Sequence, residues 1–375
     1  MSENPLVALS ELGQSIWIDD LDRARIVSGQ LHRHIEHDAL RGMTTNPTIF
    51  EKAIDGDRVY DDVIRELAVE GDRPAEIYDA IAIADVRLAA DEFRAVFDRL
   101  DQRDGFVSLE VSPHLAYDTR ATIAEARRLW TVVERPNVMI KVPATEAGIP
   151  AIEALIAEGI NINVTLLFGL DRYAAVADAY LAGLRSRGRQ RRGVRLASVA
   201  SFFLSRIDTM VDAELDARVR ARELDAGRAK RLRGRVAIAS ARLAYQHYKA
   251  LFGGSEFAPL AAMGARPQRV LWASTSTKDP AYDDIYYVEA LIGESTVDTV
   301  PIATLEAYRD HGHPERRLER GVDEAQETLR ELARVGIELD AITQRLERDG
   351  VRKFCESYDK LLAAIAKRSD AAPRA

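Results

Sequence analysis

The lysine at position 141 interrupts an apolar segment that has the character of a buried β-strand. Lys141 lies within residues 138–145, which read VMIKVPAT. Burial disfavours the charged form of a lysine, and a neutral amine is a nucleophile that can form a Schiff base with a carbonyl group. A lysine that ends a strand and extends into solvent is the alternative for this segment taken alone.

Other polar residues end strand-like apolar segments elsewhere in the chain. They are Asp19, Asn46, Glu110, Asn163, Thr165 and Ser201, and Arg206 follows in the turn after the last of these segments. Asn163 and Thr165 lie two residues apart, so both point to the same face of a strand. Taken singly, Asp19 or Asn46 could cap a following helix, and the hydroxyl residues could complete turns.

Together, these groups suit one kind of chemistry. An amine attacks a ketone, a carboxylate moves protons, carboxamides hold hydroxyl groups, and a guanidinium binds a phosphate. The set therefore predicts Schiff-base chemistry on an anionic carbonyl substrate. Because an iminium group is itself an electron sink, no metal or other cofactor is expected.

The histidines are not expected to bind a metal. His32, His34 and His37 fall on an expected helix, where His34 and His37 share a face but His32 and His34 do not. We expect these to be surface histidines. His311 and His313 fall in an expected loop after the last strand, and no metal is predicted there either. The chain also lacks a Gly-x-Ser-x-Gly elbow, which argues against a serine hydrolase.

The elements that must position these residues are short strands alternating with longer helices. The eight expected strands are Ser15–Leu21, Gly42–Asn46, Phe106–Val111, Val138–Val142, Ile160–Phe168, Leu196–Phe203, Arg269–Ser274 and Val297–Ile302. The alternation is typical of parallel sheets. Eight such units, with no Gly-x-Gly-x-x-Gly motif after a strand, predict an α/β fold of the closed (β/α)8 TIM-barrel type rather than an open doubly wound sheet. In a barrel, the carboxyl ends of the strands meet at one face.

The chain is longer than a minimal barrel. Its 375 residues exceed the roughly 250 of a typical barrel, and the excess falls between strands two and three, after strand six, and beyond Pro314. Apolar residues from Tyr173 to Leu184 follow the spacing of a helix that packs outside the sheet. Residues 1–375 are expected to form one domain with a helical extension from about 314 to 368. Seven residues are expected to pack this tail: Leu329, Leu332, Ile342, Leu346, Leu361, Leu362 and Ile365.

Composition narrows the classes of partner. The formal net charge is −8, which argues against general nucleic-acid binding. Two arginine-rich segments, 185–195 and 228–235, are expected to be loops at the surface or an interface. Phosphate or polynucleotide binding is the alternative, but the segments lack the interleaved aromatic residues on which bases stack. No apolar run approaches a membrane span. A single cysteine, Cys355, and a start without a secretory signal predict a cytoplasmic location.

The motifs resemble those of the transaldolases, class I Schiff-base enzymes of the pentose phosphate pathway. Gly42–Phe50, which reads GMTTNPTIF, resembles the first signature of the family, and Met139–Leu155 resembles the second. Similar segments extend from about residue 10 to the C-terminal helices. The resemblance implies a TIM barrel that transfers a dihydroxyacetone unit between sugar phosphates.

The resemblance also implies a role for each candidate residue. Lys141 would attack C2 of a ketose phosphate such as fructose 6-phosphate or sedoheptulose 7-phosphate. Glu110 would shuttle protons through a water held with Thr165. Asp19 would take the proton of the C4 hydroxyl as the C3–C4 bond breaks. The substrate-binding residues would be Asn46 and Asn163 for the dihydroxyacetone unit, Ser201 in the same pocket, and Arg206 for the phosphate.

Four points stay open in the sequence. Many relatives carry a second phosphate-binding arginine after the seventh strand, where this chain has Lys278, a point donor rather than a bidentate one. Asp20 and Asp22 stand beside Asp19, and spacing does not choose among them. A fructose 6-phosphate aldolase, which has a tyrosine in place of Glu110, and a non-catalytic barrel that binds sugar phosphates are the alternatives. The oligomeric state is undetermined.

Overall fold

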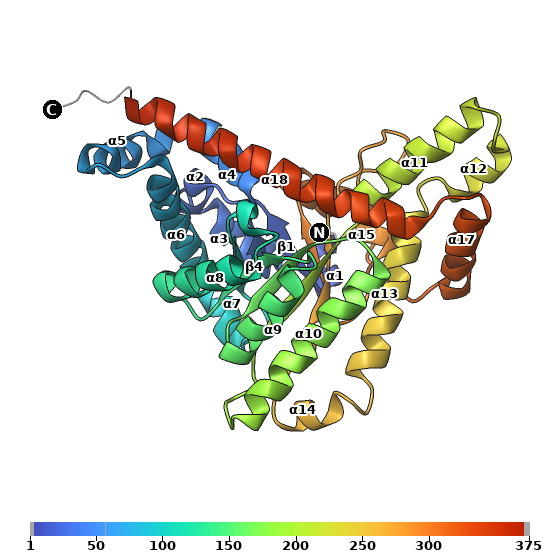
Figure 1. The fold of residues 1–375 in the computed structure, drawn as a ribbon, viewed down its shortest axis with the longest axis horizontal. Coiled ribbons are helices and arrows are strands. Elements are labelled where there is room, and N and C mark those ends of the chain that lie inside the picture. The colour runs from blue at the N-terminus through green and yellow to red at the C-terminus, as the bar shows by residue number, and fades with distance from the viewer. Residues whose placement is uncertain (1–3, 57, 371–375) are drawn as a thin grey trace.

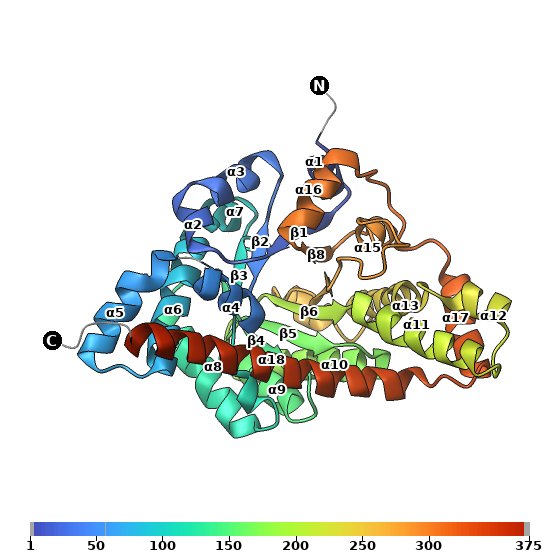
Figure 2. The ribbon, with the colours of Figure 1, turned by 90° about the horizontal axis from the view of Figure 1, so that it is seen from above.

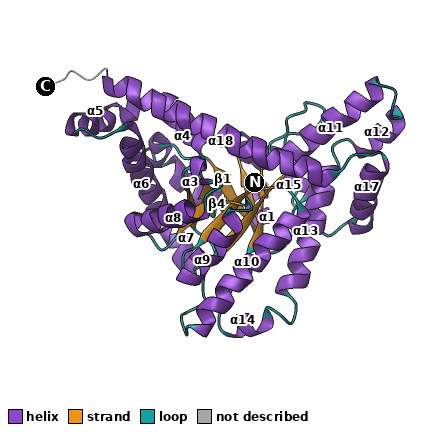
Figure 3. Ribbon diagram, in the orientation of Figure 1, coloured by secondary structure: helices purple, strands orange, loops and turns teal. Residues whose placement is uncertain are grey.

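The computed structural model describes residues 4–56 and 58–370, and within them eight parallel strands close into a barrel in the order β1 to β8 (Figure 1). The strands are β1 Gln14–Asp19, β2 Gly42–Thr44, β3 Phe106–Glu110, β4 Val138–Pro143, β5 Ile162–Leu167, β6 Ser198–Phe203, β7 Arg269–Ala273 and β8 Thr296–Val300. Figure 3 shows the strands at the centre of a helical coat. The predicted TIM barrel and its eight strands are confirmed.

The strands are apolar because helices cover their outer faces while the barrel interior is filled. Strands β3 to β6 are buried along their whole length, as expected for parallel strands. The predicted second strand is too long by two residues. It ends at Thr44 because Asn46 caps helix α4, whose first residue is Pro47.

Helices follow the strands around the barrel, with extra helices at the positions expected from chain length. Helix α1 Pro5–Glu11 precedes β1, and α2 Arg23–Val27 and α3 Gln30–His37 connect β1 to β2. After β2 come α4 Pro47–Gly56, the 3-10 turn η1 Arg58–Tyr60, α5 Asp61–Glu70, α6 Pro74–Glu92 and α7 Arg94–Arg99. After β3, β4 and β5 come η2 Pro113–Leu115, α8 Thr119–Val133, α9 Gly148–Glu158 and α10 Leu170–Arg189. After β6 come α11 Ser205–Arg220, α12 Ala226–Leu232, α13 Val236–Phe252 and α14 Ala258–Ala262. Helix α15 Tyr286–Ala290 connects β7 to β8, and α16 Ile302–His311, α17 Val322–Arg334 and α18 Leu339–Asp370 follow β8.

The C-terminal helix α18 is a 32-residue rod that crosses the molecule (Figures 1 and 2). It packs against α4, α5, α6 and α11, elements that are far apart in the sequence. The expected packing positions are confirmed: Leu332, Leu346, Leu361 and Ile365 are buried, and Leu329, Ile342 and Leu362 pack partly buried against the core. Thr48 of α4 and Ser357 of α18 share a hydrogen bond of 2.9 Å. This helix therefore connects both sides of the barrel.

Three sequence-based expectations about local structure are wrong. The segment 185–195 is not a loop throughout, because Arg185, Arg187 and Arg189 lie in the last turns of α10. The segment 228–235 contains helix α12 rather than forming a loop. His311 ends helix α16 instead of lying in a loop. Arginine has a high helix propensity, so a cluster of arginines does not by itself indicate a loop.

None of the helices in the described residues is both long and apolar enough to cross a membrane.

Gly42, at the start of β2, allows the chain to pass over a buried tryptophan. A Cβ atom at this position would lie 2.5 Å from two ring atoms of Trp17, whose side chain is fully buried. We expect Gly42→Ala to lower the free energy of unfolding by about 1–3 kcal/mol, because the ring has no room to move. Urea denaturation measures the change. The control is Gly193→Ala, where no atom lies within 4 Å of the added Cβ; equal stability of the two variants would contradict the argument.

Candidate active site

A cavity of about 300 Å³ opens at the carboxyl ends of the strands. Six of the nine residues predicted from the sequence line it: Asp19, Asn46, Lys141, Ser201, Arg206 and Lys278. The other three, Glu110, Asn163 and Thr165, are buried next to these residues in the barrel. The volume is at the small end of the range of ligand pockets, which fits a small molecule.

Lys141 is buried inside the barrel and does not extend into solvent. Its side chain is about 5% exposed, and its Nζ donates a hydrogen bond of 2.9 Å to the backbone carbonyl of Thr45. The same nitrogen lies 3.3 Å from Glu110 Oε2 and 6.0 Å from the centre of the Phe354 ring. The amine is thus held beside one carboxylate at the cavity wall.

Glu110 is the partner of Lys141 because the two residues are paired in register across β3 and β4. Burial raises the pKa of Glu110 to about 7, the positive charge of Lys141 opposes this shift, and the negative charge of Asp19 adds to it. Apart from the 3.3 Å ion pair of Oε2 with Lys141 Nζ, the carboxylate oxygens of Glu110 have no hydrogen-bond partner among the described residues, and neither has the buried Oγ1 of Thr165. These atoms can therefore exchange protons or hydrogen bonds with a bound molecule.

Asp19, the last residue of β1, is the aspartate that faces the cavity. Its Oδ1 accepts a 2.7 Å hydrogen bond from Thr44, whose Oγ1 also lies 2.7 Å from Thr299 Oγ1. Burial raises its pKa, although the charges of Lys141 and Arg206 oppose the shift. The carboxylate is therefore a stronger base than an aspartate in water.

The two neighbouring aspartates are engaged elsewhere. Asp20 pairs with Arg25 at 2.7 Å, and Asp22 caps α2 through a 2.9 Å hydrogen bond from the backbone N–H of Ala24. The choice among the three aspartates, which spacing left open, is thus made by the direction in which each side chain leaves the end of β1.

A chain of hydrogen bonds links strands β3, β5 and β6 below the cavity. Ser201 donates a 2.7 Å bond to Asn163 Oδ1, and Asn163 Nδ2 donates a 2.9 Å bond to Ser108 Oγ. Asn163 is fully buried, so this chain fixes the orientation of its amide. Asn46 has two roles, since it lines the cavity and also caps α4 through a 3.1 Å bond from the Ile49 N–H.

Three cations stand at one side of the cavity. Arg206 from α11 and Lys278 from the segment after β7 were predicted, whereas Lys52 from α4 was not. Burial lowers the pKa of Lys278, and the charges of Arg206 and Lys52 lower it further. The pKa of Arg206 is also lowered by burial. Clustered cations of this kind form a site for an anionic group such as a phosphate.

The sequence did not single out Lys52 or Phe354. Lys52 lies one helical turn after Thr48, which also lines the cavity, so helical spacing from the first signature into the residues just after it was the available signal. Phe354 comes from α18, 213 positions after Lys141 in the printed sequence. It packs beneath the guanidinium of Arg206 at 6.0 Å. An apolar residue on a long helix carries no signal of this role.

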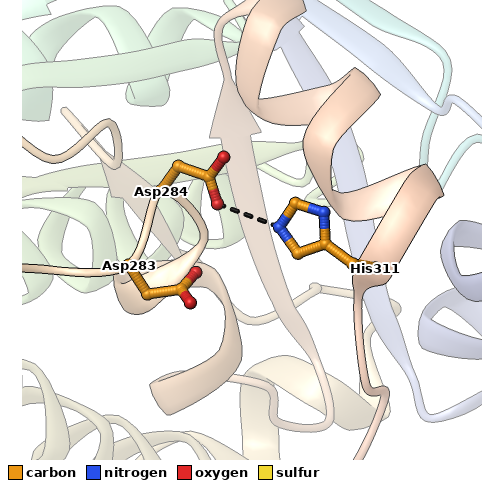
Figure 4. A group of neighbouring side chains, drawn as sticks. All are labelled: Asp283, Asp284 and His311. Atoms are coloured by element: carbon orange, nitrogen blue, oxygen red, sulfur yellow. Dashed lines mark hydrogen bonds and ion pairs between the residues drawn. The ribbon is translucent and has the colours of Figure 1, made fainter.

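The histidines have structural contacts. His34 is buried, not at the surface as expected, and its Nδ1 lies 2.7 Å from Asp38. Figure 4 shows His311 with Asp283 and Asp284 on the outside of the molecule, where His311 Nε2 lies 3.0 Å from Asp284. The carboxylates of Asp284 and Asp310 raise the pKa of His311. This exposed ion pair connects α16 to the segment before α15.

Comparison with known proteins identifies the family. Residues 16–365 match the family model described as transaldolase/fructose-6-phosphate aldolase. A protein of Frankia alni named transaldolase is 47% identical over 97% of both chains. A transaldolase of Thiobacillus denitrificans is 48% identical over 95% of this chain and 98% of its own. Transaldolase 1 of Streptomyces coelicolor is 47% identical over 97% of this chain and 95% of its own.

The fold and the site define the same class of protein as the comparisons with known proteins. The fold is a (β/α)8 barrel with a buried lysine beside carboxylates at the carboxyl ends of its strands. The chain belongs to the transaldolase/fructose-6-phosphate aldolase family. The resemblance noted in the sequence is confirmed.

The raised pKa of Glu110 makes its contribution to protein stability depend on pH, and the titration of its carboxyl group can be measured. Since the folded-state pKa of about 7 exceeds the ordinary value of 4.5, the folded protein keeps a proton that the unfolded chain has lost between these pH values. The contribution of Glu110 to stability therefore falls as the pH rises through this window. In carbon NMR of protein labelled at the glutamate carboxyl carbons, we expect one signal that titrates near pH 7 and is absent from Glu110→Gln. A full set of glutamates titrating below pH 5 would contradict the assignment.

Proposed function

We propose that this protein is a transaldolase that moves a dihydroxyacetone unit from a ketose phosphate to an aldose phosphate through a Schiff base on Lys141. The observation that carries the proposal is the buried amine of Lys141, 3.3 Å from Glu110, at the wall of a cavity that also holds Asp19 and a group of cations. The relatives named transaldolase, 47–48% identical over at least 95% of this chain, support the same activity.

Formation of the Schiff base needs proton transfers at one nitrogen and one oxygen. The Lys141 amine attacks C2 of the ketose and gives a carbinolamine, and the C2 hydroxyl then leaves as water to give an iminium. In the proposal, Glu110 carries both transfers; its contact with Nζ and its pKa of about 7, which lets it take and give a proton near neutral pH, support this role. The free Oγ1 of Thr165 supports its proposed role in holding a water that carries these protons.

Cleavage of the C3–C4 bond needs a base at the C4 hydroxyl. In the proposal, Asp19 takes this proton, the C4–O bond becomes a carbonyl, and the electrons of the C3–C4 bond move into the iminium to give an enamine. The raised pKa of Asp19 supports this role, since it makes the carboxylate more basic. After the aldose phosphate leaves, a second aldose accepts the enamine carbon, and Asp19 returns the proton to the new hydroxyl.

In the proposal, the polar wall of the cavity binds one part of the substrate and the cationic wall binds another. Asn46, Ser201 and Asn163 would hold the hydroxyl groups of the dihydroxyacetone unit, while Arg206 and Lys278 would bind the phosphate, with Lys52 beside them. The cations lie at one side of the cavity and support this orientation. Sugar phosphates such as fructose 6-phosphate and sedoheptulose 7-phosphate as donors, and erythrose 4-phosphate or glyceraldehyde 3-phosphate as acceptors, are the proposed substrates.

The alternative is a fructose 6-phosphate aldolase that releases free dihydroxyacetone, an activity that the family description also covers. Release requires water to hydrolyse the protonated enamine, whereas transfer is favoured when water is kept out. Phe354 of α18 is buried within 6.0 Å of both Lys141 Nζ and the Arg206 guanidinium, which favours transfer. A non-catalytic barrel would have no use for the adjacent Lys141 and Glu110.

A cytoplasmic location is part of the proposal. The only cysteine, Cys355, is a free thiol, so no disulfide within the chain has to be maintained in an oxidising compartment.

The first test is trapping of the covalent adduct. Fructose 6-phosphate followed by borohydride should fix a dihydroxyacetone adduct on Lys141, located by peptide mass spectrometry. Lys141→Ala should give no adduct and lower turnover at least a thousandfold, because the nucleophile is lost. Lys230→Ala, which removes an exposed lysine of α12, is the control and should behave as wild type. Full turnover in folded Lys141→Ala would sink the mechanism.

The same reaction separates transfer from release. With erythrose 4-phosphate present, a transaldolase forms sedoheptulose 7-phosphate, and glyceraldehyde 3-phosphate accumulates only when this acceptor is added. Formation of free dihydroxyacetone at the same rate without acceptor would identify the aldolase instead.

Substitution of Arg206 tests the phosphate end of the site. Because a charged hydrogen bond contributes roughly 1.5–3 kcal/mol, Arg206→Ala should raise the KM for fructose 6-phosphate about 10- to 100-fold. The KM for unphosphorylated fructose should not change. Arg220→Ala, at the exposed end of α11, is the matched control. An unaltered KM for the phosphorylated substrate in Arg206→Ala would remove this residue from the site.

A further inference from the structure

A second cavity, of about 730 Å³, lies at the opposite end of the barrel from the active site. Its lining includes Ser15 at the start of β1, Ser198 at the start of β6 and Arg269 at the start of β7. Arg41 precedes β2 and Ser295 precedes β8. The cavity is therefore formed at the amino ends of the strands. A strand of six residues such as β4 is on the order of 20 Å long, so the two cavities are separate.

This cavity is basic although the chain as a whole is acidic. Four arginines line it, Arg41, Arg103, Arg266 and Arg269, against two aspartates, Asp101 and Asp104. The whole chain has a net charge of −8. A local excess of positive charge in an acidic protein attracts anions to that place.

The two aspartates already have their partners. Buried Asp104 accepts hydrogen bonds from Ser15, from Trp17 Nε1 at 2.8 Å and from Arg269 Nη2 at 3.2 Å. Asp101 pairs with Arg195 and with Arg266, whose guanidinium also donates to the backbone carbonyl of Gln102. Arg266 and Arg269 thus have a structural function in closing the base of the barrel.

Arg41 and Arg103 are not accounted for in this way. In the described part of the chain, neither guanidinium donates a hydrogen bond or forms an ion pair. The side chain of Arg103 is exposed, and that of Arg41 is half-buried. Burial lowers the pKa of Arg41, Asp104 opposes the shift, and the charges of Arg269 and Arg99 add to it. Arg41 is thus a cation partly removed from water beside other cations, which is unfavourable unless an anion joins it, whereas the exposed Arg103 keeps its contact with water.

We propose that this basal cavity binds a phosphorylated small molecule through Arg41 and Arg103, with Arg269 lining the same cavity. The arginine fork matches the geometry of phosphate oxygens. Leu100, Tyr248 and Pro267 supply an apolar wall, so the cavity accommodates an organic group as well as its phosphate. Its volume exceeds that of the active-site cavity and lies in the range of sites for metabolite-sized ligands.

The proposal is independent of the catalytic function. It assigns a second anion site that is occupied together with the active site, rather than a second route to the same cavity. The amino-terminal face of such barrels ordinarily serves stability, and Arg266 and Arg269 fit that role. Arg41 and Arg103 do not, so their substitution should affect ligand binding and leave the folding of the protein unchanged.

Titration calorimetry with inorganic pyrophosphate tests the site in the full chain. Wild type should bind at two sites, and Arg206→Gln should keep the basal one. The double variant Arg41→Gln with Arg103→Gln should bind at the basal site at least tenfold more weakly, since two charged hydrogen-bond donors are removed. The control Arg220→Gln removes an arginine that, like Arg103, is exposed, from the end of α11, and should bind as wild type.

The location of the anion is tested directly in crystals soaked with tungstate, whose tungsten atom is found by anomalous scattering. A peak among Arg41, Arg103 and Arg269 is the expected result, with full occupancy in Arg206→Gln. The proposal is overturned if pyrophosphate binding disappears in Arg206→Gln and is unchanged in the double variant. A single site in wild type, or tungstate only at the active site, would overturn it as well.

Discussion

The contact between Lys141 and Glu110 is the constraint on which the rest of this structure depends. Removing two charges from water is costly, and their attraction offsets this cost only in a fixed geometry. The register of the barrel supplies that geometry, since Glu110 pairs with Lys141 across β3 and β4, and Lys141 pairs with Asn163 across β4 and β5. Parallel strands of a closed barrel thereby place an amine, a carboxylate and an amide in one layer.

Closure of the site depends on a helix from the other end of the chain. Helix α18 packs on α4, α5, α6 and α11, so its position is set by elements on both sides of the barrel. The centre of its Phe354 ring lies 6.0 Å from both Lys141 Nζ and the Arg206 guanidinium. The same helix thus supports the apolar surroundings of the amine and the position of the phosphate-binding arginine. The active site lies at the carboxyl ends of the strands, and the basal cavity lies at their amino ends.

Much of the site was predictable because each strand of a covered parallel barrel is apolar up to its carboxyl end. A polar residue such as Glu110 or Lys141 within such a strand is therefore conspicuous. Residue spacing does not predict a site residue where the direction of the side chain decides whether it reaches the cavity. Asp19, Asp20 and Asp22 are equivalent by spacing, yet the end of β1 directs only the first of them into the cavity. Helical arginines in α10 and α12 were mistaken for loop residues, because charge clusters occur in both.

By itself the sequence determined the barrel, its eight strands and the lysine that interrupts an apolar run, because these follow from local patterns of apolar and polar residues. The family came from the resemblance of two motifs, Gly42–Phe50 and Met139–Leu155, which are also local in the chain. The tertiary structure alone decided that Phe354 lies beside Lys141, that Lys52 joins Arg206, and that Arg41 and Arg103 line one cavity at the base of the barrel without an acceptor among the described residues. Each of these depends on packing between segments far apart in the chain, which residue spacing does not encode.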